Sequence, residues 1–247
     1  MKIKRTHDYF YLNENKKKKP KDYFYFIHHL IEKDFDLSKK NLTQLKKIKL
    51  IDIGCATGDF AHFFLKKYPT IDYLGIDVLS KLLKKAKIDL PGYKFQRGNI
   101  VNLKNLRKKK FDVVCMLSVH GIWDEFEKWL DNVINLMSIN GKAYIYGIFN
   151  PENLDVLVKM RKSDKNFANN HWESGWNNWS INTISKYLTK KKIKFKFHRW
   201  DIIRSLPKKL DPLRSYTQKL NNRKYQLVTG AQIIYNLYAL VIHGKKN

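Results

Sequence analysis

A short apolar segment that stops at a glycine constrains the fold of this chain more than any other feature. Residues 49–53 read Lys-Leu-Ile-Asp-Ile, and this β-branched run ends abruptly at Gly54, as a buried parallel strand does where it meets a tight turn. Apolar residues then recur at helical spacing from Phe60 until Pro69, where a helix cannot continue. The sequence therefore predicts a strand, a glycine turn and a helix, the unit that opens a nucleotide-binding α/β fold with its ligand at the carboxyl end of the strand.

The charge of this turn indicates which ligand it can hold. A pyrophosphate-binding turn has glycines spaced Gly-x-Gly-x-x-Gly, but counting from Gly54 this chain has Ala56 in the second place and Asp59 in the third. Together with Asp52, Asp59 makes the turn anionic, so that it repels phosphate and attracts a ligand that carries an ammonium and a sulfonium. S-adenosylmethionine is such a ligand.

The same residues resemble the first motif of the class I S-adenosylmethionine-dependent methyltransferases, an acid followed by a glycine-rich turn. In this chain the motif consists of Asp52, Gly54, Cys55, Ala56, Thr57 and Gly58. Ala56 departs from the glycine that the family often has, although a small residue still lets the backbone and the methionine approach closely. A strand and glycine turn that bind no cofactor are the alternative at this point.

A second acid strengthens the resemblance. Asp77 ends the predicted strand 72–78, 23 positions after the first glycine of the turn, and a carboxylate there accepts two hydrogen bonds from a ribose diol. The family places its ribose-binding acid at this position. After a predicted helix over 79–86 and a strand over 93–97, the family usually has an acid that meets the adenine amino group. This chain has Asn99 instead, whose amide oxygen is an uncharged acceptor.

Predicted strands and helices alternate from residue 48 to residue 149, which favours a mainly parallel sheet with crossover helices. The resemblance implies a Rossmann-like α/β fold, a seven-stranded, mainly parallel sheet with its last strand antiparallel and helices on both faces. The further elements predicted from apolar patterning are a strand over 111–119, a helix over 126–137, a turn at 140–142, strands over 143–149, 194–200 and 231–243, and a helix over 182–188.

The predicted domain organisation has two parts. Residues 1–46, with amphipathic helical patterning over 22–45, are expected to form an N-terminal helical leader or lid. Residues 47–247 are expected to form the methyltransferase domain, with acceptor-site insertions near 150–180 and 204–230, because long connections are more often functional than idle.

The charge of the chain bears on its partners. The formal net charge is +27, which by itself suggests nucleic acid. However, the basic residues are 41 Lys and 8 Arg, and the lysine runs are scattered along the chain, whereas arginine is the usual residue for bidentate recognition of phosphates and bases. We therefore favour a solvated lysine-rich surface and keep RNA as the alternative partner.

Cysteine content and hydropathy indicate the compartment. The two cysteines, Cys55 and Cys115, imply no disulfide framework and suit a reducing environment, with Cys115 expected to be inert core. The N-terminus does not resemble a signal peptide, and the apolar segment 231–242 is too short to span a bilayer. We expect a cytoplasmic protein with no membrane partner, and no metal site.

Methyl transfer from a sulfonium is an in-line displacement, in which the protein mainly aligns the reacting atoms. A general base becomes necessary when the acceptor is a hydroxyl or a protonated amine. His120, just after the fourth predicted strand, is the first candidate, and the alternative is that it packs or caps this loop. Asp124 is expected either to orient His120 or to cap the next helix. His171 with Glu173 is the second candidate pair.

An aromatic-rich segment follows the fifth predicted strand. Trp172, Trp176 and Trp179 are expected either to stack on an acceptor ring or sugar face, or to form the buried stripe of a helix. No Asn-Pro-Pro-aromatic sequence follows the fourth predicted strand, although amino-nitrogen methyltransferases often carry one there. We favour a small-molecule or sugar-like acceptor that is methylated on oxygen, because insertions after the fifth strand and between the last two strands are expected to build a closed pocket.

The expected activity is S-adenosylmethionine-dependent methyl transfer, with S-adenosylhomocysteine as product. Methylation of tRNA or rRNA is the alternative within the class. Two further candidates are a nicotinamide-dependent oxidoreductase, disfavoured by Asp59, and a methyltransferase-like scaffold that binds cofactor poorly; the oligomeric state is left open. The residues expected to bind the donor are Asp52, Gly54, Cys55, Ala56, Gly58, Asp77, Val78, Asn99, Ile100, Ser118 and Val119.

Overall fold

The structure is a computed structural model in which the chain divides into two compact units, residues 1–198 and residues 199–247. Within the second unit, β10 (Tyr216–Lys219) and β11 (Tyr225–Val228) form an antiparallel pair. The predicted boundary between residues 46 and 47 stays a prediction. The structure describes residues 7–13, 20–103, 106, 108–161, 172–202, 205–208, 214–220 and 225–228.

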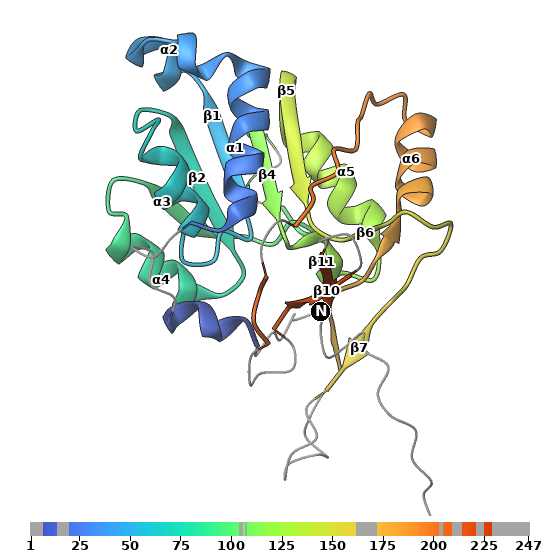
Figure 1. The fold of residues 1–247 in the computed structure, drawn as a ribbon. Helices are drawn as coiled ribbons and strands as arrows, with labels where there is room; N and C mark the ends of the chain where they lie inside the picture. Colours follow the sequence, from blue (N-terminus) through green and yellow to red (C-terminus); the bar gives the residue numbers. More distant parts are fainter. Residues whose placement is uncertain are drawn as a thin grey trace, which may run out of the picture. The chain divides into compact units, whose positions relative to one another are not determined.

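A five-stranded parallel sheet forms the centre of the first unit. Its spatial order is β3-β2-β1-β4-β5, and every neighbouring pair is parallel; Figure 1 shows β2, β1, β4 and β5 side by side in this order. The carboxyl ends of β1, β2 and β4 therefore meet at one edge of the sheet. The strands are β1 (Lys49–Ile53), β2 (Asp72–Asp77), β3 (Lys94–Arg97), β4 (Phe111–Leu117) and β5 (Met137–Tyr146).

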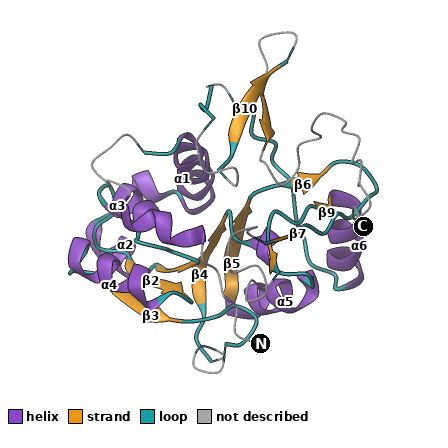
Figure 2. Cartoon of the chain, turned by 90° about the horizontal axis from the view of Figure 1, so that it is seen from below, coloured by secondary structure: helices purple, strands orange, loops and turns teal. Residues whose placement is uncertain are grey.

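Helices cover both faces of this sheet, as predicted. Figure 2 shows α1 and α3 on one side of the strands and α5 on the other. The helices are α1 (Asp22–Phe35), α2 (Leu42–Lys46), α3 (Asp59–Leu65), α4 (Ser80–Asp89), α5 (Phe126–Leu136) and α6 (Ile181–Lys190), with short 3₁₀ helices η1 (His7–Asn13), η2 (Leu37–Lys39) and η3 (His120–Ile122).

The alternation of side chains along β4 explains why two helical layers are needed. Val113 and Cys115 pack in one apolar cluster with residues of α1, α3 and α4, whereas Val114 and Met116 pack in a second cluster with residues of α5 and α6. Successive strand residues point to opposite faces, so a strand that is apolar throughout needs cover on both sides. Burial also raises the pKa of the Cys115 thiol, which is consistent with inert core.

Of the predicted strands of the sheet, one differs from the structure and one lies outside the described residues. The described residues of the main sheet form five strands, so the predicted count of seven is not confirmed, and the predicted last strand, 231–243, lies outside the described residues. Residues 194–200 are not a strand: Phe197 packs against the core, 5.3 Å from the ring of Phe149, so the alternating pattern anchors an irregular segment.

The predicted turn at 140–142 is also not a separate turn. These residues lie inside β5, and the register shifts there: Phe111 pairs with Met137, but Val113 pairs with Lys142. Residues 138–141 therefore interrupt the regular pairing of β5 with β4, at the Asn-Gly sequence.

The segment after β5 forms short strands rather than a helix. β6 (Phe149–Asn150) pairs in parallel with β9 (Trp179–Ser180), and β7 (Lys159–Met160) pairs antiparallel with β8 (Glu173–Ser174). Trp172 is 58% exposed, whereas Trp179 is buried. The interpretation of the three tryptophans as the buried stripe of a helix is therefore wrong, because residues 172–180 form short strands and irregular backbone, with Trp176 at φ of 59°.

In the part of the chain that the structure describes, none of the helices combines the length and the hydropathy that crossing a bilayer requires.

Candidate functional site

A cavity lies at the carboxyl edge of β1, β2 and β4. Three stretches of the sheet edge supply about half of its wall: residues 52–56 at and after the end of β1, residues 77–79 at the end of β2, and residues 117–119 at the end of β4. Gly98 and Ile100, which follow β3, also line it. Ligands of open α/β sheets bind at this edge, where the strand order reverses.

The turn after β1 has a backbone that depends on small residues. Gly54 has φ of 73° and Ala56 has φ of 48°, values that favour glycine and strain other residues. A Cβ at position 54 would lie 2.5 Å from Cγ2 of Val119. The backbone N–H groups of Gly54 and Cys55 donate to the carbonyl of Ile76, at 2.8 and 3.0 Å. The turn is therefore fixed against β2 with its bare backbone facing the cavity.

Asp77 is held in place by the same turn. Its Oδ2 accepts a hydrogen bond from the backbone N–H of Ala56 (3.0 Å) and its Oδ1 accepts one from that of Leu79 (2.8 Å). Burial raises the pKa of Asp77 in spite of these hydrogen bonds. Each carboxylate oxygen keeps a further lone pair, so the side chain can accept two more hydrogen bonds from ligand hydroxyls.

Asp52 is the most buried acid of the site, with an exposed fraction of 2%. Burial raises the pKa of Asp52 to about 7. The hydroxyl of Tyr73 donates a hydrogen bond to Asp52 at 3.1 Å, which lowers this pKa, whereas the negative charges of Asp77 and Asp59 raise it. A carboxylate in this position favours a cationic ligand group, because such a group relieves both the desolvation and the repulsion.

The N-terminal segment also reaches the cavity. Asp8 and Tyr11 of η1, with Lys21 and Tyr23, contribute to its wall. The ammonium of Lys21 lies 5.0 Å from the ring centroid of Tyr11 and 3.7 Å from Oδ2 of Asp59. The sequence patterns did not assign these residues to the site, since they lie about 30 or more positions before the turn; the aromatic cluster at 9–11 was the available signal. A lid function for this segment stays a prediction.

Most residues predicted to bind the donor line the cavity, and two do not. Gly58 has φ of 82°, and a Cβ there would lie 2.9 Å from Cδ1 of Leu90. Its backbone conformation and its lack of a side chain therefore allow the turn to pack against Leu90. Asn99 uses its amide oxygen to accept a hydrogen bond from the backbone N–H of Val101, at 3.1 Å. Those that line it are Asp52, Gly54, Cys55, Ala56, Asp77, Val78, Ile100, Ser118 and Val119.

His120 is a packing residue in this structure. Its side chain is 2% exposed, its ring stacks on Phe149 with centroids 4.5 Å apart, and its Nε2 lies 2.9 Å from the carbonyl oxygen of Ile148. Burial lowers its pKa to about 4, and it is not among the described residues that line the cavity. This environment favours the packing alternative over a general base. His171 lies outside the described residues, so the pair with Glu173 stays a prediction.

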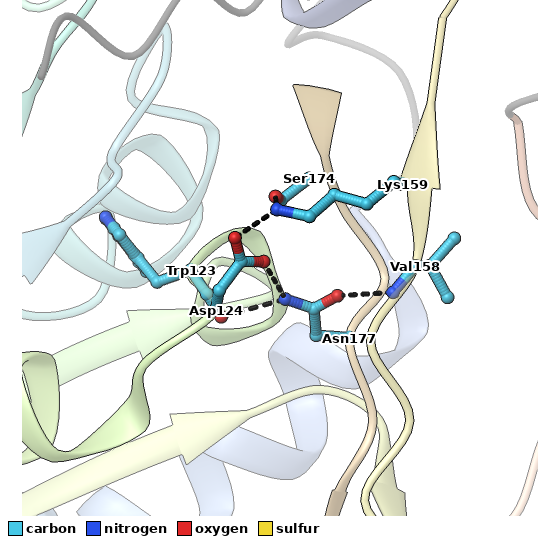
Figure 3. Close-up of polar contacts among 6 residues, drawn as sticks. All are labelled: Trp123, Asp124, Val158, Lys159, Ser174 and Asn177. Carbon is cyan, nitrogen blue, oxygen red and sulfur yellow. Dashed lines mark hydrogen bonds and ion pairs between the residues drawn. The ribbon is translucent and has the colours of Figure 1, made fainter. Parts of the chain in front are cut away.

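Asp124 takes neither of the two roles expected for it. Its carboxylate accepts hydrogen bonds from Nζ of Lys159 and from Nδ2 of Asn177 (3.1 Å), and Figure 3 shows these contacts. The residue before α5 is Glu125, which makes no side-chain cap. Asp124 therefore ties the loop after β4 to the segment after β5, and Ile122 and Trp123 of this loop line the cavity.

The residues present fit S-adenosylmethionine. A buried acid suits an ammonium, a fixed carboxylate at the end of β2 suits a ribose diol, and the turn lets a ligand approach the backbone closely. Apolar walls from Leu79, Ile100 and Val119 suit an adenine ring. A pyrophosphate fits less well, because Asp52 and Asp59 would face it.

Comparison with known proteins agrees with this geometry. Residues 51–143 match the family model of the methyltransferase domain. A trans-aconitate 2-methyltransferase from Rhodopseudomonas palustris (strain BisA53) is 32% identical over 116 residues, 46% of this chain and 43% of that protein. A trans-aconitate 2-methyltransferase from Methylobacterium nodulans is 29% identical over 55 residues, 22% and 21% of the respective chains. The chain thus spans less than half the length of either relative.

A solved structure extends the likeness of the fold. DesVI from Streptomyces venezuelae is 15% identical and superposes with a TM-score of 0.50, covering 86% of this chain and 91% of that chain. The motif after β1, the match of residues 51–143 to the methyltransferase-domain model and the fold together support a class I S-adenosylmethionine-dependent methyltransferase.

Proposed function

We propose that this protein transfers the methyl group of S-adenosylmethionine to an oxygen of a small, anionic acceptor. Two acids support the binding of S-adenosylmethionine. Asp52, at the turn after β1, is buried, and Asp77, at the end of β2, is held by hydrogen bonds from two backbone N–H groups. When bound, the donor supplies a methyl group on a positively charged sulfur, which is already activated for displacement.

The residues of the site divide the binding of the donor between them. Asp52 binds the ammonium of the methionine part, and Asp77 accepts hydrogen bonds from the ribose hydroxyls. Gly54 and Ala56 let the donor lie against the backbone, and Ile100 forms part of the wall beside the adenine. Alignment of donor and acceptor then supplies much of the rate enhancement.

The lack of a histidine in the described part of the wall supports the choice of acceptor. Among the described residues that line the cavity there is no histidine, so a neutral hydroxyl would have to lose its proton without one. A carboxylate oxygen is ionised at neutral pH and needs no base. The relatives in Rhodopseudomonas palustris and Methylobacterium nodulans are named for trans-aconitate, which is a tricarboxylate, and a net charge of +27 attracts anions of this kind.

RNA is the second candidate acceptor, and the same positive charge favours it. RNA and a small anionic acceptor differ in how their binding responds to salt. RNA contacts several lysines at once, so its affinity should fall steeply with ionic strength. Filter binding of bulk tRNA and rRNA from about 50 to about 400 mM salt, over which the screening length shortens about threefold, distinguishes them. Weak binding with a shallow slope favours the small acceptor.

Donor binding is tested first and without any acceptor. We expect S-adenosylhomocysteine to raise the thermal unfolding midpoint, and NAD⁺ to leave it unchanged, since only a ligand of the folded state stabilises it. Release of S-adenosylhomocysteine from S-adenosylmethionine is then followed with a panel of di- and tricarboxylates, sugar acids, neutral sugars and tRNA. Turnover with neutral sugars but not with carboxylates would overturn the choice of an anionic acceptor.

A further inference from the structure

Ser118 lies at the end of β4 in a backbone conformation that is rare for a residue with a side chain. Its φ is 61°, in the left-handed region that favours glycine. Asp36 and Lys192 also have positive φ, but they lie at the carboxyl ends of helices, where this conformation is common. Ser118 instead ends a strand and lines the cavity. Backbone strain of this kind is concentrated at functional sites.

The backbone of Ser118 is held by β5, and its side chain is exposed. The N–H of Ser118 donates to the carbonyl oxygen of Tyr146 at 2.6 Å, one residue beyond the last paired position of β4. The residue itself is exposed at the cavity. Because the N–H is used within the sheet, the donor that Ser118 can offer to a ligand is its hydroxyl group.

Ser118 lies on the side of the cavity away from the part assigned to the nucleoside. The sheet order places β1 between β2 and β4, so the ends of β2 and β4 are two strand spacings, about 10 Å, apart. Asp77 at the end of β2, with Gly98 and Ile100 after β3, line the far part of the cavity. The end of β4 is therefore available to the molecule that receives the methyl group.

Tyr146 connects Ser118 to the start of α1. The ring of Tyr146 stacks on the ring of Tyr23, with centroids 4.3 Å apart and planes 10° apart, while its carbonyl oxygen accepts from Ser118. Tyr23 lines the cavity as Ser118 does. Two segments that are about 95 positions apart in the sequence thus supply an aromatic ring and a hydroxyl group to the same end of the cavity.

We propose that Ser118 binds the acceptor: its hydroxyl donates a hydrogen bond to the oxygen of the acceptor carboxylate that does not receive the methyl group. A hydroxyl on a backbone that is already fixed loses little further freedom when a ligand binds. This inference rests on the proposed function, because it takes the acceptor to be a carboxylate and places the donor's nucleoside at β2 and β3. It also assigns Ser118 to the acceptor, whereas the sequence predicted that it binds the donor.

The chemistry of the transfer indicates which kinetic constant depends on this hydrogen bond. A lone pair of one carboxylate oxygen forms the new O–C bond while the C–S bond breaks, and the electrons of that bond leave with the sulfur as a neutral thioether. The carboxylate becomes an uncharged ester, so its negative charge decreases toward the transition state. A hydrogen bond to its other oxygen is strongest before the transfer, and its loss should raise KM rather than lower kcat.

Ser118→Ala removes the hydroxyl and tests this role. Initial rates are measured with the di- or tricarboxylate of the panel that the parent protein methylates fastest. We expect KM for this carboxylate to rise about tenfold or more, because a hydrogen bond to a charged group is lost, and kcat to stay within about threefold. The affinity for S-adenosylhomocysteine, measured by calorimetry, should stay within about twofold of that of the parent protein.

Ser118→Gly separates the hydroxyl from the strained backbone. Glycine adopts a φ of 61° without strain, so the thermal unfolding midpoint should lie about 1–4 °C above that of Ser118→Ala. KM should rise as much as in Ser118→Ala, because both variants lack the hydroxyl. If the side chain had only a structural role, the glycine variant would keep the KM of the parent protein, and that result would overturn the inference.

Ser38→Ala is the matched control. Ser38 of η2 is also exposed and is not among the described residues that line the cavity, so its KM and kcat should stay within about twofold of the parent values. If Ser118→Ala weakens S-adenosylhomocysteine as much as it raises KM, Ser118 binds the donor and the inference is wrong. If the parent protein binds S-adenosylhomocysteine but methylates none of the carboxylates, the proposed acceptor fails first.

Discussion

Asp52 shows how one residue connects binding to stability. It is almost fully buried, and burial raises its pKa to about 7, so near neutral pH its carboxyl group is only partly ionised in the free protein. A cationic ligand group binds the ionised form. Donor binding should therefore be coupled to release of a proton from this residue.

The first prediction concerns the pH dependence of this binding. Below about pH 7, S-adenosylhomocysteine must displace a proton from Asp52, so its affinity should fall by up to about tenfold per pH unit. Calorimetry at about pH 6, 7 and 8 in buffers of different ionisation enthalpy measures both the affinity and the proton release. An affinity that is constant over this range would contradict the assignment of Asp52 to the ammonium.

The second prediction concerns stability without ligand. Because the pKa of Asp52 is higher in the folded protein than in the unfolded chain, its favourable contribution is fully present below about pH 4 and is lost as the pH rises through about 7. Asp52→Asn should therefore raise the free energy of unfolding at about pH 8, by about 2–4 kcal/mol, and by less at about pH 5. Urea denaturation at both pH values measures this, with Asp72→Asn at an exposed position as control. Asp52→Asn, but not Asp72→Asn, should also lose donor binding.

At the scale of elements, α1 joins the N-terminal part of the cavity wall to the core. Its buried residues Phe24, Ile27 and Ile31 pack in the apolar cluster on its side of the sheet. At its carboxyl end, Asp34 accepts a hydrogen bond from Tyr144 of β5 (2.8 Å) and pairs with Lys142 (2.9 Å). The helix is therefore fixed along its length by the core and at its end by β5.

The third prediction follows from this packing. Ile31 is fully buried in α1, so Ile31→Ala should lower the free energy of unfolding by about 2–4 kcal/mol through lost burial and the remaining cavity. Ile88 of α4 is 78% exposed, and Ile88→Ala should change it by less than about 0.5 kcal/mol. Chemical denaturation measures both. Similar losses in the two variants would show that α1 is not held by the core.

At the scale of the whole molecule, the first compact unit holds the sheet and the cavity. The buried hydrophobic residues among those described lie between Phe24 and Leu188, and every described residue that lines the cavity lies between Asp8 and Trp123. All of these residues belong to the first unit, 1–198.

The fourth prediction tests that division. A fragment of residues 1–198 should fold cooperatively and bind S-adenosylhomocysteine with an affinity within about threefold of that of the full chain, because all of the cavity wall described is retained. Circular dichroism, thermal unfolding and calorimetry measure this. Loss of binding in a fragment that still unfolds cooperatively would place a donor contact in residues 199–247.

The fold class, and the edge of the sheet at which the cavity lies, could be predicted because their signals are local. An apolar β-branched run ending at Gly54, and an acid at the end of the next strand, are fixed by backbone geometry within a few residues. The parallel sheet with helices on both faces follows from strands that are apolar on both sides. These features do not depend on distant parts of the chain.

Only the tertiary structure decided which distant residues complete the site. The sequence predicted His120 at the correct edge of the sheet, but its burial against Phe149 depends on a segment that follows the next helix and strand. Lys21 and Tyr23, which line the cavity, come from a part of the chain that no periodicity connects to the turn after β1. Local sequence determines how the backbone turns, whereas burial and hydrogen-bond partners depend on packing between elements that are far apart in the chain.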